Sequence, residues 1–223
     1  MYNSKYLCHM TKIQSFIFNS FQENTYILFD DTKECIIVDP GCYEKYEQKL
    51  LLDFVVKNKL NPVKLINTHC HIDHVLGNHF VAEKWKLELA MHELDVPTLK
   101  SVKDYCTVYG FHNYQESPLP SRFLNEGEKV KFGESELDIL FTPGHAPGHI
   151  VLHSKKYDFI IGGDVLFQMS IGRTDLPGGD FDTLIESIKE KLLPLDDNTK
   201  VYCGHGPTTN IGFEKANNPF LKN

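Results

Sequence analysis

The sequence predicts an α/β protein, in which short strands alternate with amphipathic helices. Two β-rich halves are visible, each with helical stretches, and neither a linker nor a low-complexity tract separates them. A chain of 223 residues is long enough to bury one core of ordinary size. We therefore expect a single α/β domain over residues 1–223.

Three strands are expected to open the first half, because short β-rich runs occupy residues 13–18, 25–29 and 34–38. Polar turn residues at 30–33 join the last two runs, so these should form a hairpin. A helix follows over 43–59, where Leu51, Phe54 and Val55 share one face and charged residues occupy the other. The chain should then continue as a strand at 63–67, a helix near 78–86, a strand at 87–91 and a helix from about 93.

A polar, aromatic and proline-containing stretch runs from about 101 to 125. The second half should then contain strands near 129–132, 136–142, 149–153 and 157–161, a helix at 180–191, a strand at 199–203 and a short helix near 212–216. Strands and helices thus alternate over most of the chain, which supports the α/β class.

Three histidines and one aspartate lie directly after the strand expected at 63–67. His69, His71, Asp73 and His74 fall within six consecutive positions. Neutral imidazole and carboxylate are the ligands that zinc and similar divalent cations prefer. On a loop after a strand, His69 and His71 would leave the backbone on one side, and the other two would reach toward a neighbouring point. The run therefore predicts a site for a pair of divalent metals.

Three more candidate ligands follow strand-like runs later in the chain. His145, Asp164 and His205 each stand beside glycine, which lets the backbone turn sharply and approach closely. Ligands that converge from the carboxyl ends of strands are the usual layout of a site on an α/β scaffold. We therefore expect seven groups to form one metal site: His69, His71, Asp73, His74, His145, Asp164 and His205.

The order of these motifs resembles the metallo-β-lactamase superfamily. The pattern H-x-H-x-D-H is followed by G-H, then G-D, then G-H-G, and the similarity runs from about Asn24 to the C-terminus. The resemblance implies a four-layer αβ/βα sandwich. More narrowly, residues 163–167 and 170–180 are similar to the glyoxalase II-like branch, and 204–207 with 218–221 are similar to its short bacterial members.

The resemblance also implies how the ligands divide. It places two metals on either side of a bridging Asp164, with three further ligands each: His69, His71 and His145 for the first metal, and Asp73, His74 and His205 for the second. We expect zinc, two ions per chain; iron or manganese also fits, because His/Asp sites select weakly among divalent ions. We assign Asp73 a catalytic role as well.

Such a site favours hydrolysis of a thioester. Two cations a few ångström apart can share a hydroxide and lower its pKa toward neutrality. A thiolate, whose conjugate acid has a pKa of about 8.5, can leave without a dedicated acid, whereas an amide nitrogen must be protonated. We therefore expect a glyoxalase II-like thiolester hydrolase that releases a 2-hydroxy acid from a small-molecule acyl-thiol. About eighteen residues follow His205, where larger glyoxalase II enzymes carry a basic helical extension that grips the thiol, so the thiol carrier stays open.

Two other functions also stay open. The G-R-T-D sequence at 172–175 is shared with persulfide dioxygenases, which hold a single iron through two histidines and one aspartate, here His69, His145 and Asp164. A metal-storing or scaffold protein without turnover is the second alternative. Metal analysis with oxygen uptake separates the first from a hydrolase, and hydrolysis assays test the second.

Arg173 is the candidate substrate-binding residue. It follows Gly172 downstream of Asp164, with Asp175 two residues on. A guanidinium offers a fixed fork of donors for carboxylates. Arg173 is therefore expected either to form a surface ion pair with Asp175 or to hold an anionic substrate group at the mouth of the site.

Four other residues near the motifs are expected to play supporting parts. Asp39 should order a loop or accept a hydrogen bond from a ligating imidazole. His149 is interpreted as a surface or hydrogen-bonded histidine rather than a ligand. Cys70 and Cys203 neighbour candidate ligands, and the alternation along each loop should turn their thiols away from the metals.

Composition bounds the partners and the compartment. The net charge of −7 argues against a general nucleic-acid-binding surface, and no run approaches membrane-spanning length. Six cysteines without a C-x-x-C pair indicate free thiols in a reducing compartment, and the first ten residues lack a signal-peptide pattern. We expect a cytoplasmic protein; its oligomeric state stays open.

Overall fold

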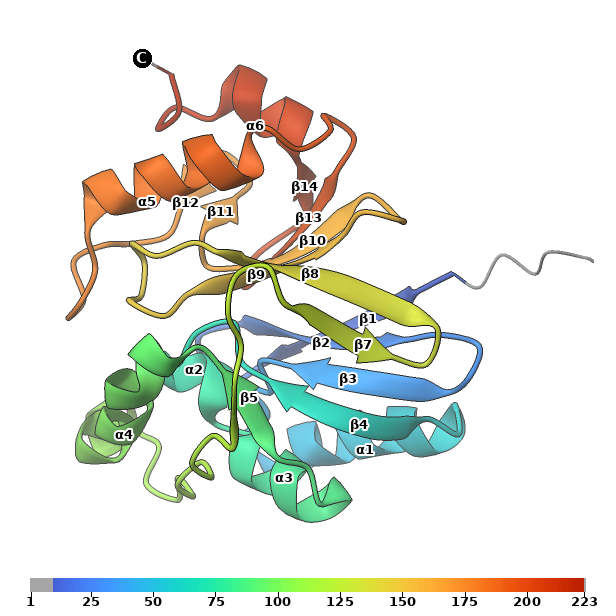
Figure 1. The fold of residues 1–223 in the computed structure, drawn as a ribbon. Helices are drawn as coiled ribbons and strands as arrows, with labels where there is room; N and C mark the ends of the chain where they lie inside the picture. The colour runs from blue at the N-terminus through green and yellow to red at the C-terminus, as the bar shows by residue number, and fades with distance from the viewer. Residues whose placement is uncertain (1–9, 223) are drawn as a thin grey trace, which may run out of the picture.

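The computed structural model describes residues 10–222, and it shows two sheets packed face to face between helices (Figure 1). The amino-terminal segment 1–9, which includes Cys8, and residue 223 lie outside the described residues. No helix in the described range is both long enough and apolar enough to cross a membrane.

Over residues 10–222, the first sheet has six strands in the order β1-β2-β3-β4-β5-β6. The strands are β1 (Lys12–Phe18), β2 (Glu23–Phe29), β3 (Glu34–Val38), β4 (Asn61–Ile66), β5 (Leu89–Met91) and β6 (Arg122–Phe123). The first three strands are antiparallel, and β3 to β6 are parallel. Parallel neighbours need crossover connections, and helical segments supply them: α1 (Lys45–Lys57), then α2 (Ile72–Val75) and α3 (Asn78–Trp85), then η1 (Glu93–Asp95), α4 (Val96–Tyr105) and η2 (Cys106–Tyr109).

The second sheet, within the same range, has the order β14-β13-β10-β9-β8-β7. Its strands are β7 (Lys129–Phe132), β8 (Ser135–Phe141), β9 (Ile150–Ser154), β10 (Phe159–Gly163), β13 (Lys200–Cys203) and β14 (Thr209–Asn210). Between β10 and β13 lie the small hairpin β11 (Leu166–Phe167) and β12 (Ser170–Ile171), then α5 (Phe181–Ser187) with the π-helical turn η3 (Ile188–Leu192). The last helix is α6 (Ile211–Asn217).

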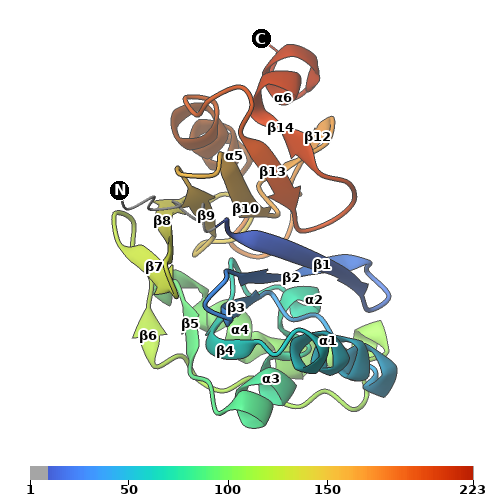
Figure 2. The ribbon, with the colours of Figure 1, turned by 90° about the vertical axis from the view of Figure 1, so that its right-hand side faces the viewer.

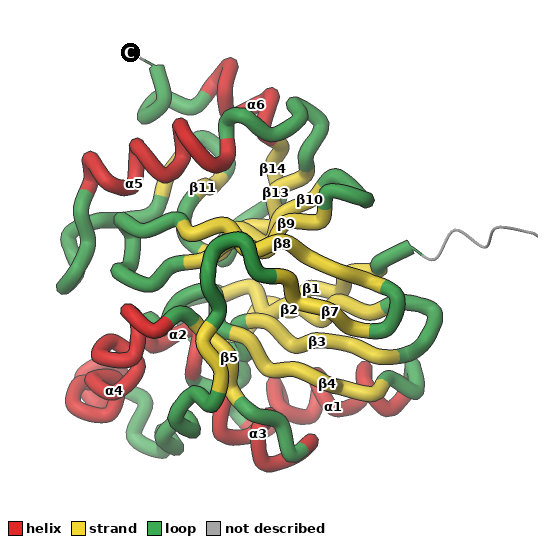
Figure 3. Tube along the Cα trace, in the orientation of Figure 1, coloured by secondary structure: helices red, strands yellow, loops and turns green. Residues whose placement is uncertain are grey.

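Alternation along the strands creates the layers. On β3, Ile36 faces the core between the two sheets and Ile37 faces the core beneath α1. On β10, Ile161 faces the core between the sheets and Ile160 faces the core beneath α5. The first sheet is thus covered by α1 and α3, and the second by α5 and α6 (Figures 2 and 3). The predicted four-layer αβ/βα sandwich is confirmed.

Most expected elements are present. The β2–β3 hairpin forms as expected. The helix expected from about 93 includes α4, which continues to Tyr105 and is followed by η2, so helical structure extends into the polar stretch that begins near 101. Leu99, Val102 and Cys106 form the buried stripe of this segment, and the polar residues between them obscured its helical spacing. Helix α2 and the two-residue strands were not predicted.

Candidate metal centre

The four strand ends that carry the candidate ligands meet at one end of the sandwich. Strands β8, β10 and β13 run in the same direction, because β9 is antiparallel to the first two and β13 is parallel to β10. Their carboxyl ends therefore share one edge of the second sheet. The segment after β4 in the facing sheet reaches the same place, where Thr68 O accepts a hydrogen bond from Ile150 N at 2.9 Å.

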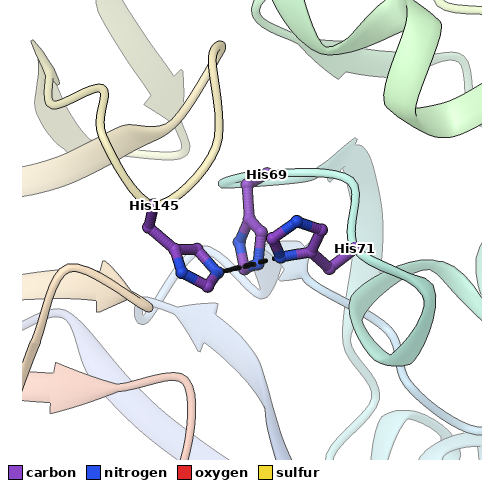
Figure 4. Close-up of side chains that lie close together, drawn as sticks. All are labelled: His69, His71 and His145. Carbon is purple, nitrogen blue, oxygen red and sulfur yellow. Dashed lines mark hydrogen bonds between the residues drawn. The ribbon is translucent and has the colours of Figure 1, made fainter. Parts of the chain in front are cut away.

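Three imidazoles converge on one point (Figure 4). His71 Nδ1 lies 2.9 Å from His145 Nε2, which lies 3.2 Å from His69 Nε2. Two nitrogens bound to a tetrahedral zinc ion, with Zn–N near 2.0–2.1 Å, are about 3.3 Å apart. The three nitrogens are therefore spaced as the ligands of one ion would be.

A second group forms beside the first. His205 Nε2 lies 3.0 Å and His74 Nε2 lies 3.7 Å from Asp73 Oδ2, and the donor atoms of all three lie within 4.8 Å of one another. Helix α2 explains why they face a different point from His69 and His71. It begins immediately after His71, whose backbone is extended, so Asp73 and His74 project from a helical turn instead of an extended loop.

Asp164 lies between the two groups. Its Oδ2 is 3.5 Å from the Nε2 atoms of both His145 and His205, and its Oδ1 is 3.4 Å from His74 Nε2. A Cβ at position 204 would lie 2.0 Å from Asp164 Oδ1, so Gly204 leaves the space that this carboxylate occupies. The structure thus brings together all seven residues predicted from the sequence.

Backbone carbonyl oxygens accept hydrogen bonds from two of the histidines on the side of the ring that faces away from the site. His145 Nδ1 donates to Arg173 O at 2.7 Å, and His205 Nδ1 donates to Phe21 O at 3.1 Å. A bond of this kind fixes the tautomer and leaves the Nε2 lone pair directed into the site.

Asp39 orders the loop after β4, as predicted. Its Oδ1 accepts from Thr68 N at 2.7 Å, and its Oδ2 accepts from Thr68 Oγ1 at 2.5 Å and lies 3.2 Å from His74 Nδ1. Because the hydroxyl proton of Thr68 goes to Asp39, its Oγ1 can accept from His69 Nδ1 at 3.2 Å. Asp39 also lies close enough to His69 and His74 to share an ion with them, but both its oxygens are engaged by Thr68, so a positioning role fits better.

Two supporting residues went unnoticed in the sequence, and a third, His149, proves to be hydrogen-bonded, which was one of its two interpretations. Glu23 is fully buried with Oε1 3.9 Å from His74 Nδ1, and burial raises the pKa of its carboxyl well above the usual range. Asp95 is buried and accepts backbone hydrogen bonds from both Cys70 N and Gly148 N at 2.7 Å. His149 is not on the surface but fully buried, and its Nε2 accepts from Asp164 N at 3.0 Å.

Asp95 joins the two ligand-bearing halves, so its loss should destabilise the fold. Asp95→Ala leaves two buried N–H groups without an acceptor, each costing about 1–3 kcal/mol. We expect the free energy of unfolding in urea to fall by about 3 kcal/mol at matched metal content. The control is Asp53→Ala, which removes an exposed ion pair with Lys49 and should change stability by less than about 0.5 kcal/mol. Equal effects of the two substitutions would contradict the role assigned to Asp95.

Burial and mutual proximity set the charges of the site. Burial lowers the pKa of His69 well below its usual value, and the neighbouring histidines lower it further. Burial also lowers the pKa of His71 to about 3. Both imidazoles are therefore neutral near pH 7, the form that binds a cation. Burial alone would raise the pKa of Asp164, but His74 and His145 outweigh it and hold that pKa below the usual range, so the carboxylate is ionised.

The donor set fits divalent metal ions. Among the described residues, the buried atoms His74 Nε2 and Asp164 Oδ1 have no hydrogen-bond partner, although an unpaired buried polar atom is costly. They face each other at 3.4 Å. Cations held by imidazole and carboxylate atoms would satisfy these groups, and that combination suits zinc, iron and manganese.

The neighbouring residues behave largely as expected. Cys70 Sγ lies 3.5 Å from Met91 Sδ in an apolar cluster, and Cys203 belongs to the core beneath α5. Both thiols therefore turn away from the donor atoms. Arg173 donates through Nε and Nη2 to the two carboxylate oxygens of Asp175 at 2.7 and 2.8 Å. The expected surface ion pair is thus formed, and it occupies the donor fork.

A cavity of about 740 Å³ opens beside the donor groups. His71, Asp73, His145 and Asp164 line it, together with residues of α4, η2 and the loop after Arg173. A second cavity, of about 460 Å³, contains none of the candidate ligands. Small molecules can therefore reach the donor cluster through the larger cavity.

Comparison with known proteins places this arrangement in a class. A sequence profile of the metallo-β-lactamase superfamily matches residues 19–205, and the chain belongs to this superfamily of metal-dependent hydrolases.

Particular relatives are similar over nearly their whole length. Hydroxyacylglutathione hydrolase GloC of Haemophilus influenzae is 42% identical over 210 residues, which cover 91% of this chain and 94% of the relative. The crystal structure of the B3 metallo-β-lactamase BLEG-1 has a TM-score of 0.86 at 32% identity, covering 95% of this chain and 100% of that one. TTHA1623, solved in a di-iron-bound form, has a TM-score of 0.83 at 35% identity, covering 93% and 100%.

Proposed function

We propose that this protein is a glyoxalase II-like thioester hydrolase that releases a 2-hydroxy acid from a small-molecule acyl-thiol. The observation that carries the proposal is the position of Asp164, within 3.5 Å of imidazole nitrogens from both donor groups, where it lines a cavity open to small molecules. The similarity to a hydroxyacylglutathione hydrolase supports the choice of bond. The test is hydrolysis of S-lactoylglutathione by protein of measured metal content, and failure on all thioesters and esters would overturn the proposal.

In this proposal the seven donor residues hold two divalent ions. His69, His71 and His145 would hold the first, Asp73, His74 and His205 would hold the second, and Asp164 would contribute to both. When bound, such ions supply a hydroxide nucleophile near neutral pH and polarise a carbonyl. Asp73 has a further part in catalysis, because it lines the cavity. Burial would raise the pKa of its carboxyl, but His74 and a hydrogen bond to His205 outweigh it, so an ionised carboxylate oxygen faces the substrate.

We propose zinc as the metal, with iron as the alternative that the di-iron form of TTHA1623 brings forward. Elemental analysis of protein purified without added metal distinguishes the two.

The persulfide dioxygenase alternative needs one iron at His69, His145 and Asp164, and it leaves Asp73, His74 and His205 without a function. The second donor group therefore favours the hydrolase, and oxygen uptake with a thiol persulfide, confined to iron-loaded protein, would reverse that preference.

We propose Arg173 as the substrate-binding residue at the mouth of the cavity. If it binds an anionic part of the substrate, Arg173→Ala should raise KM for S-lactoylglutathione by roughly three- to tenfold, because a surface charge contact contributes about 1 kcal/mol. Metal content should stay constant, since His145 is held by the backbone carbonyl of Arg173 and not by its side chain.

Asp175→Ala provides the opposing variant. It frees the fork of Arg173 from the two hydrogen bonds to Asp175, so KM for the same substrate should fall. Unchanged KM in both variants would show that Arg173 forms only the ion pair with Asp175 and does not bind substrate.

A further inference from the structure

Apolar side chains line the outer wall of the larger cavity, and the proposed reaction at the donor groups does not require them. Leu94, Val108 and Tyr109 line it from η1 and η2, and their side chains are 49%, 81% and 49% exposed. Exposed apolar side chains that gather along one groove are typical of a ligand-binding surface. Because these three residues stand beside the donor cluster, the cover is expected to come from the substrate.

Aromatic contacts hold this wall in place. The ring of Phe21, from the turn between β1 and β2, lies 5.6 Å from that of Tyr109 and 6.0 Å from that of Phe111. The rings of Tyr105 and Tyr109 are 5.9 Å apart. Three of these rings line the cavity, and they support one another across two segments that are distant in the sequence. The apolar surface is therefore shaped before a substrate enters.

Outside the donor groups, the walls of the cavity offer little positive charge to an anionic ligand. Arg173 is the one lysine or arginine among the described residues that line it. Its Nε and Nη2 donate to Asp175, so only part of the guanidinium remains for a ligand. Glutathione carries two carboxylates, and the walls beyond the donor groups offer them this one guanidinium.

We infer that the thiol half of the substrate is a predominantly apolar group of low charge rather than an anionic peptide. The inference rests on the proposed thioesterase function. The 2-hydroxyacyl half is small and polar, so it fills little of a cavity of about 740 Å³. The remaining space, along Leu94, Val108 and Tyr109, belongs to the leaving thiol, which contributes binding by removing apolar surface from water.

The test compares lactoyl thioesters of three alkyl thiols: 2-phenylethanethiol, N-acetylcysteamine and glutathione. The bond broken is the same, so differences report on the thiol half. We expect kcat/KM for the phenylethyl thioester to exceed that for the N-acetylcysteamine thioester by roughly 10- to 50-fold, mainly through KM, for an added apolar contact of one ring. The glutathione thioester should be no better than the N-acetylcysteamine thioester. A glutathione thioester that is the best of the three would overturn the inference.

A binding experiment separates this inference from the proposed function. Two non-hydrolysable thioethers, 1-(2-phenylethylthio)propan-2-ol and S-(2-hydroxypropyl)glutathione, are titrated into the protein, and their binding is measured by isothermal titration calorimetry. Tighter binding of the phenylethyl compound, without hydrolysis of any thioester, would refute the thioesterase function and support binding of apolar groups in the cavity. If the phenylethyl compound binds equally or more weakly while thioesters are hydrolysed, the thioesterase function stands and the inference of an apolar thiol half is refuted.

A matched pair of valine substitutions locates the effect. Val108→Glu puts a charge on the cavity wall at a residue that touches none of the donor groups, and Val56→Glu puts the same charge on α1, at a valine that is 65% exposed and outside the cavity lining. Val108→Glu should lower kcat/KM for the phenylethyl thioester about five- to tenfold and leave the N-acetylcysteamine thioester within twofold. Val56→Glu should change neither. A uniform loss on both substrates in Val108→Glu would place the thiol half elsewhere.

Discussion

Replacing Asp164 by alanine is expected to remove metal from both donor groups at once. Its two oxygens lie within 3.4–3.5 Å of imidazole nitrogens on His74, His145 and His205, so this one carboxylate contacts both donor groups. His74→Ala should empty one group and leave the other. We expect Asp164→Ala to retain less metal than His74→Ala and to lose roughly 10²–10⁴-fold in kcat, more than the 10–100-fold typical of residues that merely support a ligand.

Elemental analysis of the two variants and the parent, purified side by side, gives the answer. Asp164→Asn is the companion variant, because it keeps the volume and one oxygen and so guards against a folding defect in the alanine variant. Asp53→Ala, at an exposed carboxylate of α1, should match the parent in metal and activity. Equal metal occupancy in Asp164→Ala and the parent would refute the assignment of Asp164 as the bridging ligand.

The convergence of the donor residues could be predicted because each one follows a strand. His145, Asp164 and His205 come after β8, β10 and β13, whose apolar runs are visible in the sequence, and parallel strand ends share an edge. The same reasoning predicted the supporting position of Asp39 at the end of β3. Local pattern and strand direction together were sufficient for these residues.

The division into two donor groups depends on a structure too short for sequence periodicity. Helix α2 has four residues, whereas a helical pattern becomes legible over about eleven or more. It is this turn that directs Asp73 and His74 away from His69. The division was expected from the family resemblance, and the physical reason for it became visible in the fold.

Tertiary burial explains the residues that the sequence did not reveal. Glu23 and Asp95 are carboxylates in ordinary-looking contexts, and acidic residues are usually exposed. Asp95 is buried because it joins the loops after β4 and β8, and Glu23 is buried where β2 meets His205 and His74. The cavity wall is similar: Phe21, Leu94 and Tyr109 are distant in the chain, so no local pattern joins them.

The largest expected difference in rate concerns the bond that is broken. A thiol of pKa about 8.5 leaves as the thiolate, whereas an amine must gain a proton as it leaves. Three titratable groups of the cavity are poor sources of that proton. Burial raises the pKa of Tyr105 above its already high usual value, and Asp73 and Asp164 are held ionised. We therefore expect kcat/KM for a lactoyl thioester to exceed that for a cephalosporin by at least about 10³-fold, or roughly 4 kcal/mol of barrier.

The comparison is made on one zinc-loaded preparation, with an activated ester as a third substrate of intermediate rate. Its outcome is informative because BLEG-1, a structure 32% identical to this chain, is described as a B3 metallo-β-lactamase. In the proposed function the donor cluster of this chain would supply the same nucleophile to either substrate, so the leaving group must decide between them. Equal or inverted values of kcat/KM would mean that a proton donor enters with the substrate or from solvent, and the thioesterase proposal would give way to a lactamase. A large ratio would show that the donor cluster alone does not make a lactamase, and that expulsion of the leaving group limits what this site can hydrolyse.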